Sequence, residues 1–145
     1  MLRDRNLIPL SHQHQHALAL CVQIDRSAAT DLDALQAQAR TMFNLEIRWH
    51  FAAEEEALFP AAAAFPELQP LVEQLLAEHA ALRQYFARAE QRQLDHAGLR
   101  AFAQFLSAHI RKEERQLFEA CQRLFSADKL AQVGAALDAA LHRAS

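Results

Sequence analysis

The sequence predicts an all-α protein, an up-down-up-down four-helix bundle with an additional short C-terminal helix. Apolar residues make up 52% of the 145 residues, yet the chain has only two Gly and four Pro, too few for the turns of a β-sandwich or barrel. Ala, Leu, Gln, Glu and Arg, which favour helices, dominate it, and apolar residues recur at helical spacing. We expect a single domain over 1–145, with the bundle at about 11–125.

The first helix is expected after an irregular segment over residues 1–10. Ser11 is a residue type that caps helices, and the apolar pattern after it continues to about Ala28. The buried side of this helix is expected to carry Leu18, Cys21, Val22 and Ala28.

The second helix is expected to begin at a capping pattern formed by Thr30 and Asp33. Because proline lacks an amide N–H and clashes with the preceding turn, this long helix should break or kink at Pro60. Its apolar positions are Leu35, Met42, Leu45, Trp49 and Phe51.

Three further helices complete the expected architecture. Residues 65–70 hold two prolines and form a linker, and Pro70 suits the first turn of a third helix that runs to about Gln93. Asp95 caps a fourth helix. Ser126 caps a short C-terminal helix over about 127–141, which packs on one end of the bundle.

Charge and cysteine content exclude several classes of function. A net charge of −3 and a pI near 6.2 give no electrostatic footprint for nucleic acid or an anionic membrane. Cys21 and Cys121 lie too far apart in the sequence for a CxxC zinc site, and two cysteines build no disulfide framework. The N-terminus lacks the apolar core of a signal peptide, and the longest apolar run, 57–65, contains a proline. We therefore expect a soluble, cytoplasmic protein without nucleic-acid or membrane partners.

An internal repeat draws attention to two of the eight histidines. The segment His50–Phe59 aligns with His109–Phe118, since both read His, apolar, two variable residues, Glu-Glu, two variable residues, Leu-Phe. Positions i and i+4 share a helix face, so each segment presents an imidazole and a carboxylate, Glu54 or Glu113, in one direction.

Two more helices supply inward-facing imidazoles. His79 is in phase with the apolar residues of the third helix, and among His12, His14 and His16 on the first helix His14 has the best phase. Four His and two Glu form a nitrogen and oxygen set that suits iron or manganese. Six ligands exceed one tetrahedral zinc and fit a carboxylate-bridged pair of ions roughly 3.5–4 Å apart. Ordinary hydrogen bonding among these side chains, without metal, is the alternative.

The order of these residues resembles the hemerythrin-like (HHE cation-binding) family, whose pattern is H…HxxxE…H…HxxxE. In this chain the pattern is matched by His14, by HFAAE at 50–54, by His79 and by HIRKE at 109–113. The resemblance extends to about Phe125. It implies two iron ions, His14, His50, His79 and His109 as ligands, and Glu54 and Glu113 as bridging carboxylates. Glu114 is an alternative to Glu113, as His12 and His16 are to His14.

The resemblance also implies a function. Members of the family are linked to O₂, nitric oxide, peroxide or iron, so a small diatomic or peroxide ligand is the expected partner. Oxygen carriers of the family have HxxxH on the third helix, whereas here Arg83 follows His79 and is no ligand. This departure disfavours simple O₂ transport. An enzyme acting on peroxide or nitric oxide through the same site is left open, as is a mononuclear or metal-free interaction module.

Overall fold

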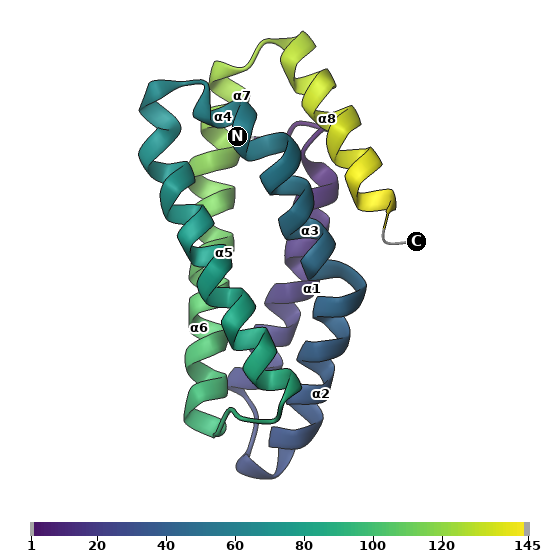
Figure 1. The fold of residues 1–145 in the computed structure, drawn as a ribbon, viewed down its shortest axis with the longest axis vertical. Helices are drawn as coiled ribbons and strands as arrows, with labels where there is room; N and C mark the ends of the chain where they lie inside the picture. The colour runs from purple at the N-terminus through teal and green to yellow at the C-terminus, as the bar shows by residue number, and fades with distance from the viewer. Residues whose placement is uncertain (1, 144–145) are drawn as a thin grey trace.

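The computed structural model describes residues 2–143, which form four long helical columns and a fifth helix along one side (Figure 1). Within this range there are helices and no strands, so the predicted all-α class is confirmed. The columns are α1 (Ile8–Asp25); then η1 (Ala29–Asp31), α2 (Leu32–Met42), η2 (Phe43–Ile47), α3 (Arg48–Ala53), η3 (Glu54–Leu58) and α4 (Phe59–Ala63); then η4 (Pro66–Leu68) and α5 (Gln69–Glu90); then α6 (His96–Lys112), η5 (Glu113–Phe118) and α7 (Glu119–Leu124); and last α8 (Ala127–His142).

Three of the predicted helix starts are confirmed. Pro70 lies in the first turn of α5, where a backbone N–H would have no hydrogen-bond acceptor within the helix, so proline is tolerated. The Asp95 carboxylate accepts the backbone N–H of Gly98 at 2.6 Å, and the Ser126 hydroxyl accepts that of Lys129 at 3.1 Å. These side chains satisfy amide groups that have no partner inside the helix, which fixes where α6 and α8 begin.

The predicted bounds of the first helix are wrong. α1 begins at Ile8, with Pro9 in its first turn, and ends at Asp25 rather than near Ala28. Ser11 therefore lies inside the helix, and its hydroxyl donates to the Glu114 carboxylate at 2.7 Å instead of capping. Val22 was expected in the core but lies on the outer face, 45% exposed.

The second column also departs from the sequence prediction. Its N-terminal cap is not Thr30: the Asp31 carboxylate accepts the N–H of Ala28 at 2.8 Å in the short turn η1. Of the predicted break or kink at Pro60, the break is absent: the column continues, because the π-helical turn η3 ends just before and Pro60 falls in the first turn of α4. A second π-helical turn, η2, changes the helical phase and leaves Leu45 71% exposed rather than in the core.

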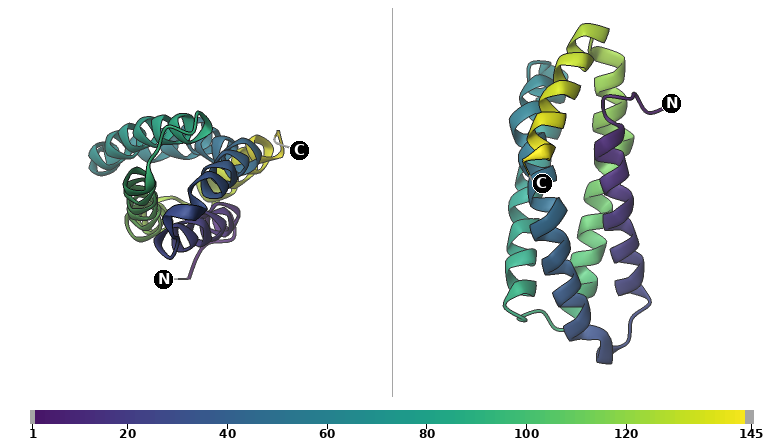
Figure 2. Two further views of the ribbon diagram at one scale, coloured as in Figure 1. Left: turned by 90° about the horizontal axis from the view of Figure 1, so that it is seen from below. Right: turned by 90° about the vertical axis from the view of Figure 1, so that its right-hand side faces the viewer.

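The columns pack as an antiparallel bundle, with α1 along α6 and α2 along α5 (Figure 2). α8 lies beside α3 and η3 rather than across the open end of the bundle (Figure 1). A side chain at Gly134 would overlap Asn6, so glycine allows α8 to approach the N-terminal segment closely. Arg143, near the end of α8, donates to the Glu56 carboxylate at 2.6 Å.

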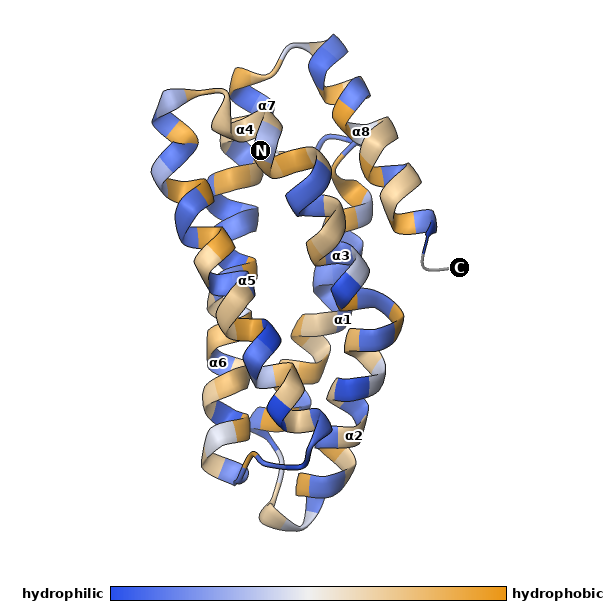
Figure 3. Cartoon of the chain, viewed as in Figure 1, coloured by the Kyte–Doolittle hydropathy of each residue, from blue (hydrophilic) through white to orange (hydrophobic). Residues whose placement is uncertain are grey.

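Apolar residues alternate with polar ones along every helix (Figure 3), and the buried ones form two separate clusters. One cluster lies toward the end where α8 packs and includes Leu10, Leu58, Leu75, Leu117 and Cys121. The other lies toward the opposite end and includes Ala17, Cys21, Phe51, Leu82 and Ile110. On each column the buried polar side chains lie close to the point where one cluster ends and the other begins. No helix in the described range is long and apolar enough to cross a membrane.

Candidate metal centre

The space between the two apolar clusters is occupied by polar side chains. Among the described residues, seven polar side chains are buried. One of them, Gln36, accepts the backbone N–H of Leu94 at 3.1 Å. The other six are the residues singled out from the sequence: His14, His50, Glu54, His79, His109 and Glu113. Each of the four columns of the bundle contributes at least one of them.

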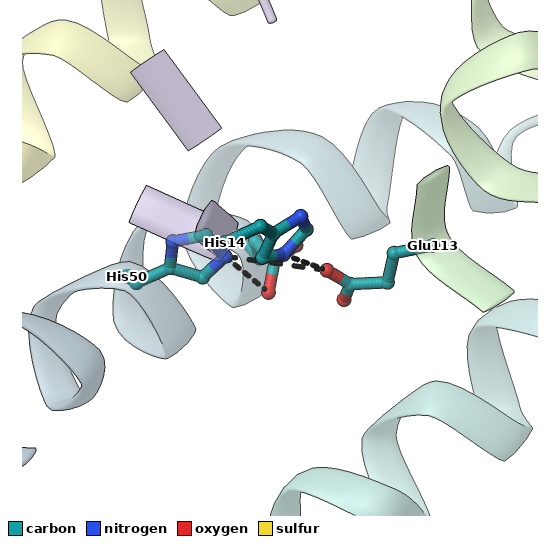
Figure 4. Close-up of side chains that lie close together, drawn as sticks. His14, His50 and Glu113 are labelled. Carbon is teal, nitrogen blue, oxygen red and sulfur yellow. Dashed lines mark hydrogen bonds and ion pairs between the residues drawn. The ribbon is translucent and has the colours of Figure 1, made fainter. Parts of the chain in front are cut away.

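These six side chains form two overlapping groups with the arrangement of metal ligands. His14 and His50 make up one group together with Glu54 and Glu113, and His79 and His109 make up the other with the same two carboxylates. Within each group the potential ligand atoms all lie within 4.8 Å of one another. Figure 4 shows His14 and His50 directed toward the carboxylate of Glu113. Two shared carboxylates and two imidazoles for each group are the composition of a binuclear site.

The imidazoles turn their Nε2 atoms toward the carboxylates. The distances are 2.9 Å from His14 Nε2 to Glu113 Oε1, 3.5 Å from His50 Nε2 to Glu54 Oε1, 3.2 Å from His79 Nε2 to Glu54 Oε1, and 3.2 Å from His109 Nε2 to Glu113 Oε2. Two donor atoms bound to one ion at about 2.1 Å and at right angles are about 3 Å apart. The spacing therefore fits first-row metal ions.

The two carboxylates that both groups share, Glu54 and Glu113, begin π-helical turns. η3 starts at Glu54 and η5 starts at Glu113, so the sequence repeat is also a repeat in backbone structure. A π-helical turn holds one more residue than an α-helical turn and is found mostly at functional sites. In both turns the Glu and the Leu four residues later are buried. The Phe that comes next, Phe59 or Phe118, packs against a histidine of the neighbouring column, with ring centroids 5.2 Å from His79 and 5.6 Å from His14.

Each imidazole is also held from outside through Nδ1. The contacts are His14 Nδ1 to Glu114 Oε2 at 2.6 Å, His50 Nδ1 to Gln13 Oε1 at 2.8 Å, His79 Nδ1 to Glu55 Oε2 at 2.7 Å, and His109 Nδ1 to Glu78 Oε1 at 2.8 Å. Carboxylate and amide oxygens only accept hydrogen bonds, so every Nδ1 donates. Outer hydrogen bonds of this kind orient metal-ligating histidines, fix the tautomer and raise ligand basicity.

Most of the inward-facing atoms lack a hydrogen-bond partner within the protein. They are the Nε2 atoms of His50, His79 and His109, both carboxylate oxygens of Glu54, and Oε2 of Glu113. Buried polar atoms without partners are costly and rare in folded proteins. Six such atoms at one place, all of them nitrogen or oxygen donors, fit a metal centre of the kind the resemblance implies.

In the metal-free protein, protons on the histidines balance the negative charges of the buried carboxylates. Burial alone would lower the pKa of His79, but contacts with Glu113, Glu54 and Glu55 outweigh it and raise this pKa to about 11. In the same way, burial is outweighed by contacts with Glu113 and Glu114 at His14, whose pKa rises to about 10. Protonated imidazoles therefore balance the buried carboxylates of the metal-free protein, and metal ions would displace these protons.

Comparison with protein families agrees with this geometry. The hemerythrin HHE cation-binding domain matches residues 9–121, about three quarters of the chain. The chain belongs to this family. Neither the curated proteins nor the solved structures compared with it gave a match. The matched range includes all six buried His and Glu of the site and leaves α8 outside.

The structure of this HHE domain shows which of the alternative residues from the sequence analysis face the site and which lie outside it. Glu113 lies inside the site with no exposed surface, whereas Glu114 lies behind His14 as an outer hydrogen-bond acceptor. His12 is exposed, and His16 is directed outward to Glu46, with its Nδ1 at 3.0 Å from Oε1. His14 is thus the histidine of α1 that reaches the site.

His96, His142 and Cys21 lie outside the HHE site. His96 contacts the Ser27 hydroxyl at 3.0 Å near the far end of the bundle, and His142 lies on α8. Cys21 is buried in an apolar cluster, and burial raises the pKa of its thiol to about 12. It is not part of either ligand group.

Of the outer partners of the histidines, sequence analysis named Glu114, as an alternative ligand, and missed the others. Glu55 was not among the candidate site residues, yet it accepts from His79 and forms two hydrogen bonds with Arg83, at 2.8 and 3.0 Å. Burial alone would raise the pKa of Glu55, but His79 and Arg83 outweigh it and lower this pKa to about 2. The available signal was position: Glu55 and Glu114 directly follow the shared carboxylates Glu54 and Glu113, and Gln13 and Glu78 directly precede a histidine.

A small cavity adjoins the centre of this HHE domain. Its volume is about 10 Å³, enough for about one water-sized molecule. His14, His50 and His109 line one side of it, and Gln13 and Glu46, which are partly exposed, lie at another. The remaining wall is apolar and consists of Ala17, Ile47, Phe51, Leu106 and Ile110.

Proposed function

We propose that this HHE domain holds two iron ions and takes up a small diatomic molecule or peroxide at them. His14 and His50 would ligate one ion, His79 and His109 the other, and Glu54 and Glu113 would bridge both. The observation that carries the proposal is the set of buried, unpartnered nitrogen and oxygen atoms that face one another at the middle of the bundle.

The donor set supports iron over softer metals. All six proposed ligands are imidazoles or carboxylates, which suit iron and manganese, and the two thiols of the chain lie in the apolar clusters instead. Iron held in this way supplies redox chemistry and an electron-rich binding position for a small ligand. The chain's own side chains position the donors, exclude bulk water and leave room beside three of the histidines.

The size and lining of the cavity support a small ligand. A volume of about 10 Å³ accommodates a molecule of two or three heavy atoms only with slight movement of its walls. Its mostly apolar wall gives little to hold an ion or a larger polar substrate. O₂, nitric oxide and peroxide are the ligands that combine this size with affinity for iron.

Metal content tests the dinuclear part of the proposal. Protein from iron-supplemented expression is expected to contain about two iron ions per chain and to absorb visible light. Glu113→Ala should lower the iron content sharply, because this carboxylate belongs to both groups, whereas Glu119→Ala, on the same column, should leave it unchanged. About one iron per chain, or zinc that iron does not displace, would favour a mononuclear centre and contradict the proposal.

The ligand part is tested by filling the cavity. Ala17 is buried at its wall and Ala19 is exposed on the same helix, so Ala17→Val and Ala19→Val form a matched pair. With iron content equal in both, Ala17→Val should weaken nitric oxide binding to the reduced protein, followed by its visible spectrum, and Ala19→Val should not. Equal affinities in the two variants would show that the ligand does not enter through this cavity.

A further inference from the structure

The hydrogen bonds behind the histidines follow an internal two-fold pattern. In each half of the bundle a column with a single ligand histidine, α1 or α5, is followed by a column with an HxxxEE segment. The second Glu of each HxxxEE segment holds the single histidine of the adjacent column: Glu114 holds His14 and Glu55 holds His79. Each of these carboxylates also contacts an arginine, Arg3 or Arg83.

The same pattern applies to the residue before each single histidine. Glu78 precedes His79 and accepts from His109 Nδ1, and it is also paired with Lys112. Its counterpart precedes His14 and accepts from His50 Nδ1, but this residue is Gln13, a neutral amide. The two halves therefore differ at one outer contact of the four.

This difference gives the two proposed metal positions unequal surroundings. The position formed by His79 and His109 has two carboxylates behind its imidazoles, whereas the position formed by His14 and His50 has one carboxylate and one amide. A carboxylate behind an imidazole makes Nε2 a stronger electron-pair donor than an amide does. Both positions share the same bridging carboxylates, so these do not offset the difference.

Packing acts in the same direction. His79 has no exposed surface and stacks on Phe51, with ring centroids 3.9 Å apart. Its counterpart His14 stacks on Phe118 at the longer centroid distance of 5.6 Å and is 5% exposed. A ligand that is already held in place loses less conformational freedom when a metal binds.

We propose, building on the dinuclear function above, that the two positions bind metal in a fixed order. The His79/His109 position fills first and holds its ion more tightly, and Gln13 is the positioning residue that keeps the His14/His50 position weaker. Exchanging an outer partner changes metal affinity by about 10- to 100-fold in known sites, so we expect a difference of about 10-fold or more.

Titration of the metal-free protein with Zn²⁺, a diamagnetic probe, tests the order directly. With ¹⁵N-labelled histidine, the ring signals of His79 and His109 should change during the first equivalent and those of His14 and His50 during the second. Signals are assigned by single His→Ala substitutions. All four signals changing together, or His14 and His50 changing first, would overturn the inference.

The role of Gln13 is tested by restoring the two-fold pattern. Gln13→Glu should tighten the second equivalent by about 10-fold in a calorimetric titration and bring the two steps together. Gln15→Glu adds the same charge at an exposed position of the same helix and should change neither step by more than about twofold. Identical behaviour of the two variants would remove Gln13 from the explanation.

The reciprocal substitution, Glu78→Gln, should weaken the first step and also reduce the gap between the two steps. Two equivalents bound in another order would overturn the inference and leave the dinuclear function standing. Binding that stops at one equivalent would overturn the dinuclear function itself.

Discussion

The stability of the metal-free protein should fall as the pH rises through the neutral range. The pKa of His14 is about 10 and that of His79 about 11 in the folded protein, against an ordinary value of 6.5, because contacts with Glu113 and the other nearby carboxylates outweigh the effect of burial. A histidine whose pKa is raised by folding contributes stability that is complete below the unfolded pKa of 6.5. This stability is lost as the pH rises toward the folded pKa.

The size of the effect follows from proton counts. Between pH 7.5 and 8.5 the unfolded chain has released the protons of its histidines, whereas the folded protein retains at least those of His14 and His79. Two retained protons match the two buried carboxylates, Glu54 and Glu113. Each proton corresponds to about 1.4 kcal/mol per pH unit, so the free energy of unfolding should fall by at least about 2.7 kcal/mol over this unit. That is a large fraction of the roughly 5–15 kcal/mol typical of a domain.

Urea unfolding of chelator-treated protein, followed by far-UV circular dichroism at several pH values, measures this slope. Glu113→Gln removes one buried negative charge and should reduce the slope by about half, whereas His96→Ala, outside the site, should leave it unchanged. Free energies of unfolding that stay constant or increase between pH 7.5 and 8.5 would refute the assignment of protonated histidines to the metal-free site.

Three further outcomes are expected. Affinity for metal should show the opposite trend and increase with pH, because metal ions must displace the imidazole protons; a pH-independent affinity in calorimetric titrations would contradict this. His79→Ala should lower iron content more than His96→Ala, and equal iron content would show that α5 supplies no ligand. Reduced protein should oxidise in air rather than bind O₂ reversibly, because Arg83 stands where oxygen carriers have a second imidazole. Arg83→His should slow this oxidation. A visible spectrum of the wild-type protein that changes reversibly on addition and removal of O₂ would contradict this prediction.

Much of the site could be predicted from the sequence because its residues stand out against an apolar background. A histidine or glutamate in phase with leucine and phenylalanine must be buried, and a buried polar side chain needs a partner. Because each of four helices carried such a residue, a common site at the centre of the bundle was the simplest way to give all of these side chains partners. The structure accordingly places His14, His50, Glu54, His79, His109 and Glu113 together, and they are six of the seven buried polar side chains in the range 2–143.

What the sequence could not predict depends on local changes of helical pitch and on contacts between columns. The exposure of Leu45 and the continuation of the helix at Pro60 both follow from π-helical turns, which constant periodicity does not anticipate. The hydrogen bonds of Glu55 and Glu114 reach side chains on neighbouring columns, and spacing within one helix carries no information about those. Ser11 shows the same limit, because a residue that favours caps found a distant acceptor instead.

The structure gives Arg83 a role that the sequence does not indicate. Seen in the sequence, it marks an imidazole that oxygen carriers have and this chain lacks. In the structure its guanidinium holds Glu55, which holds His79, so it supports a ligand from outside the site. With no fifth histidine, both proposed positions have two imidazoles each, and the two halves of the bundle match in their donor atoms. An inequality between the two proposed positions would then arise outside the donor atoms, from the packing of the rings and from the outer contacts, where Gln13 stands opposite Glu78.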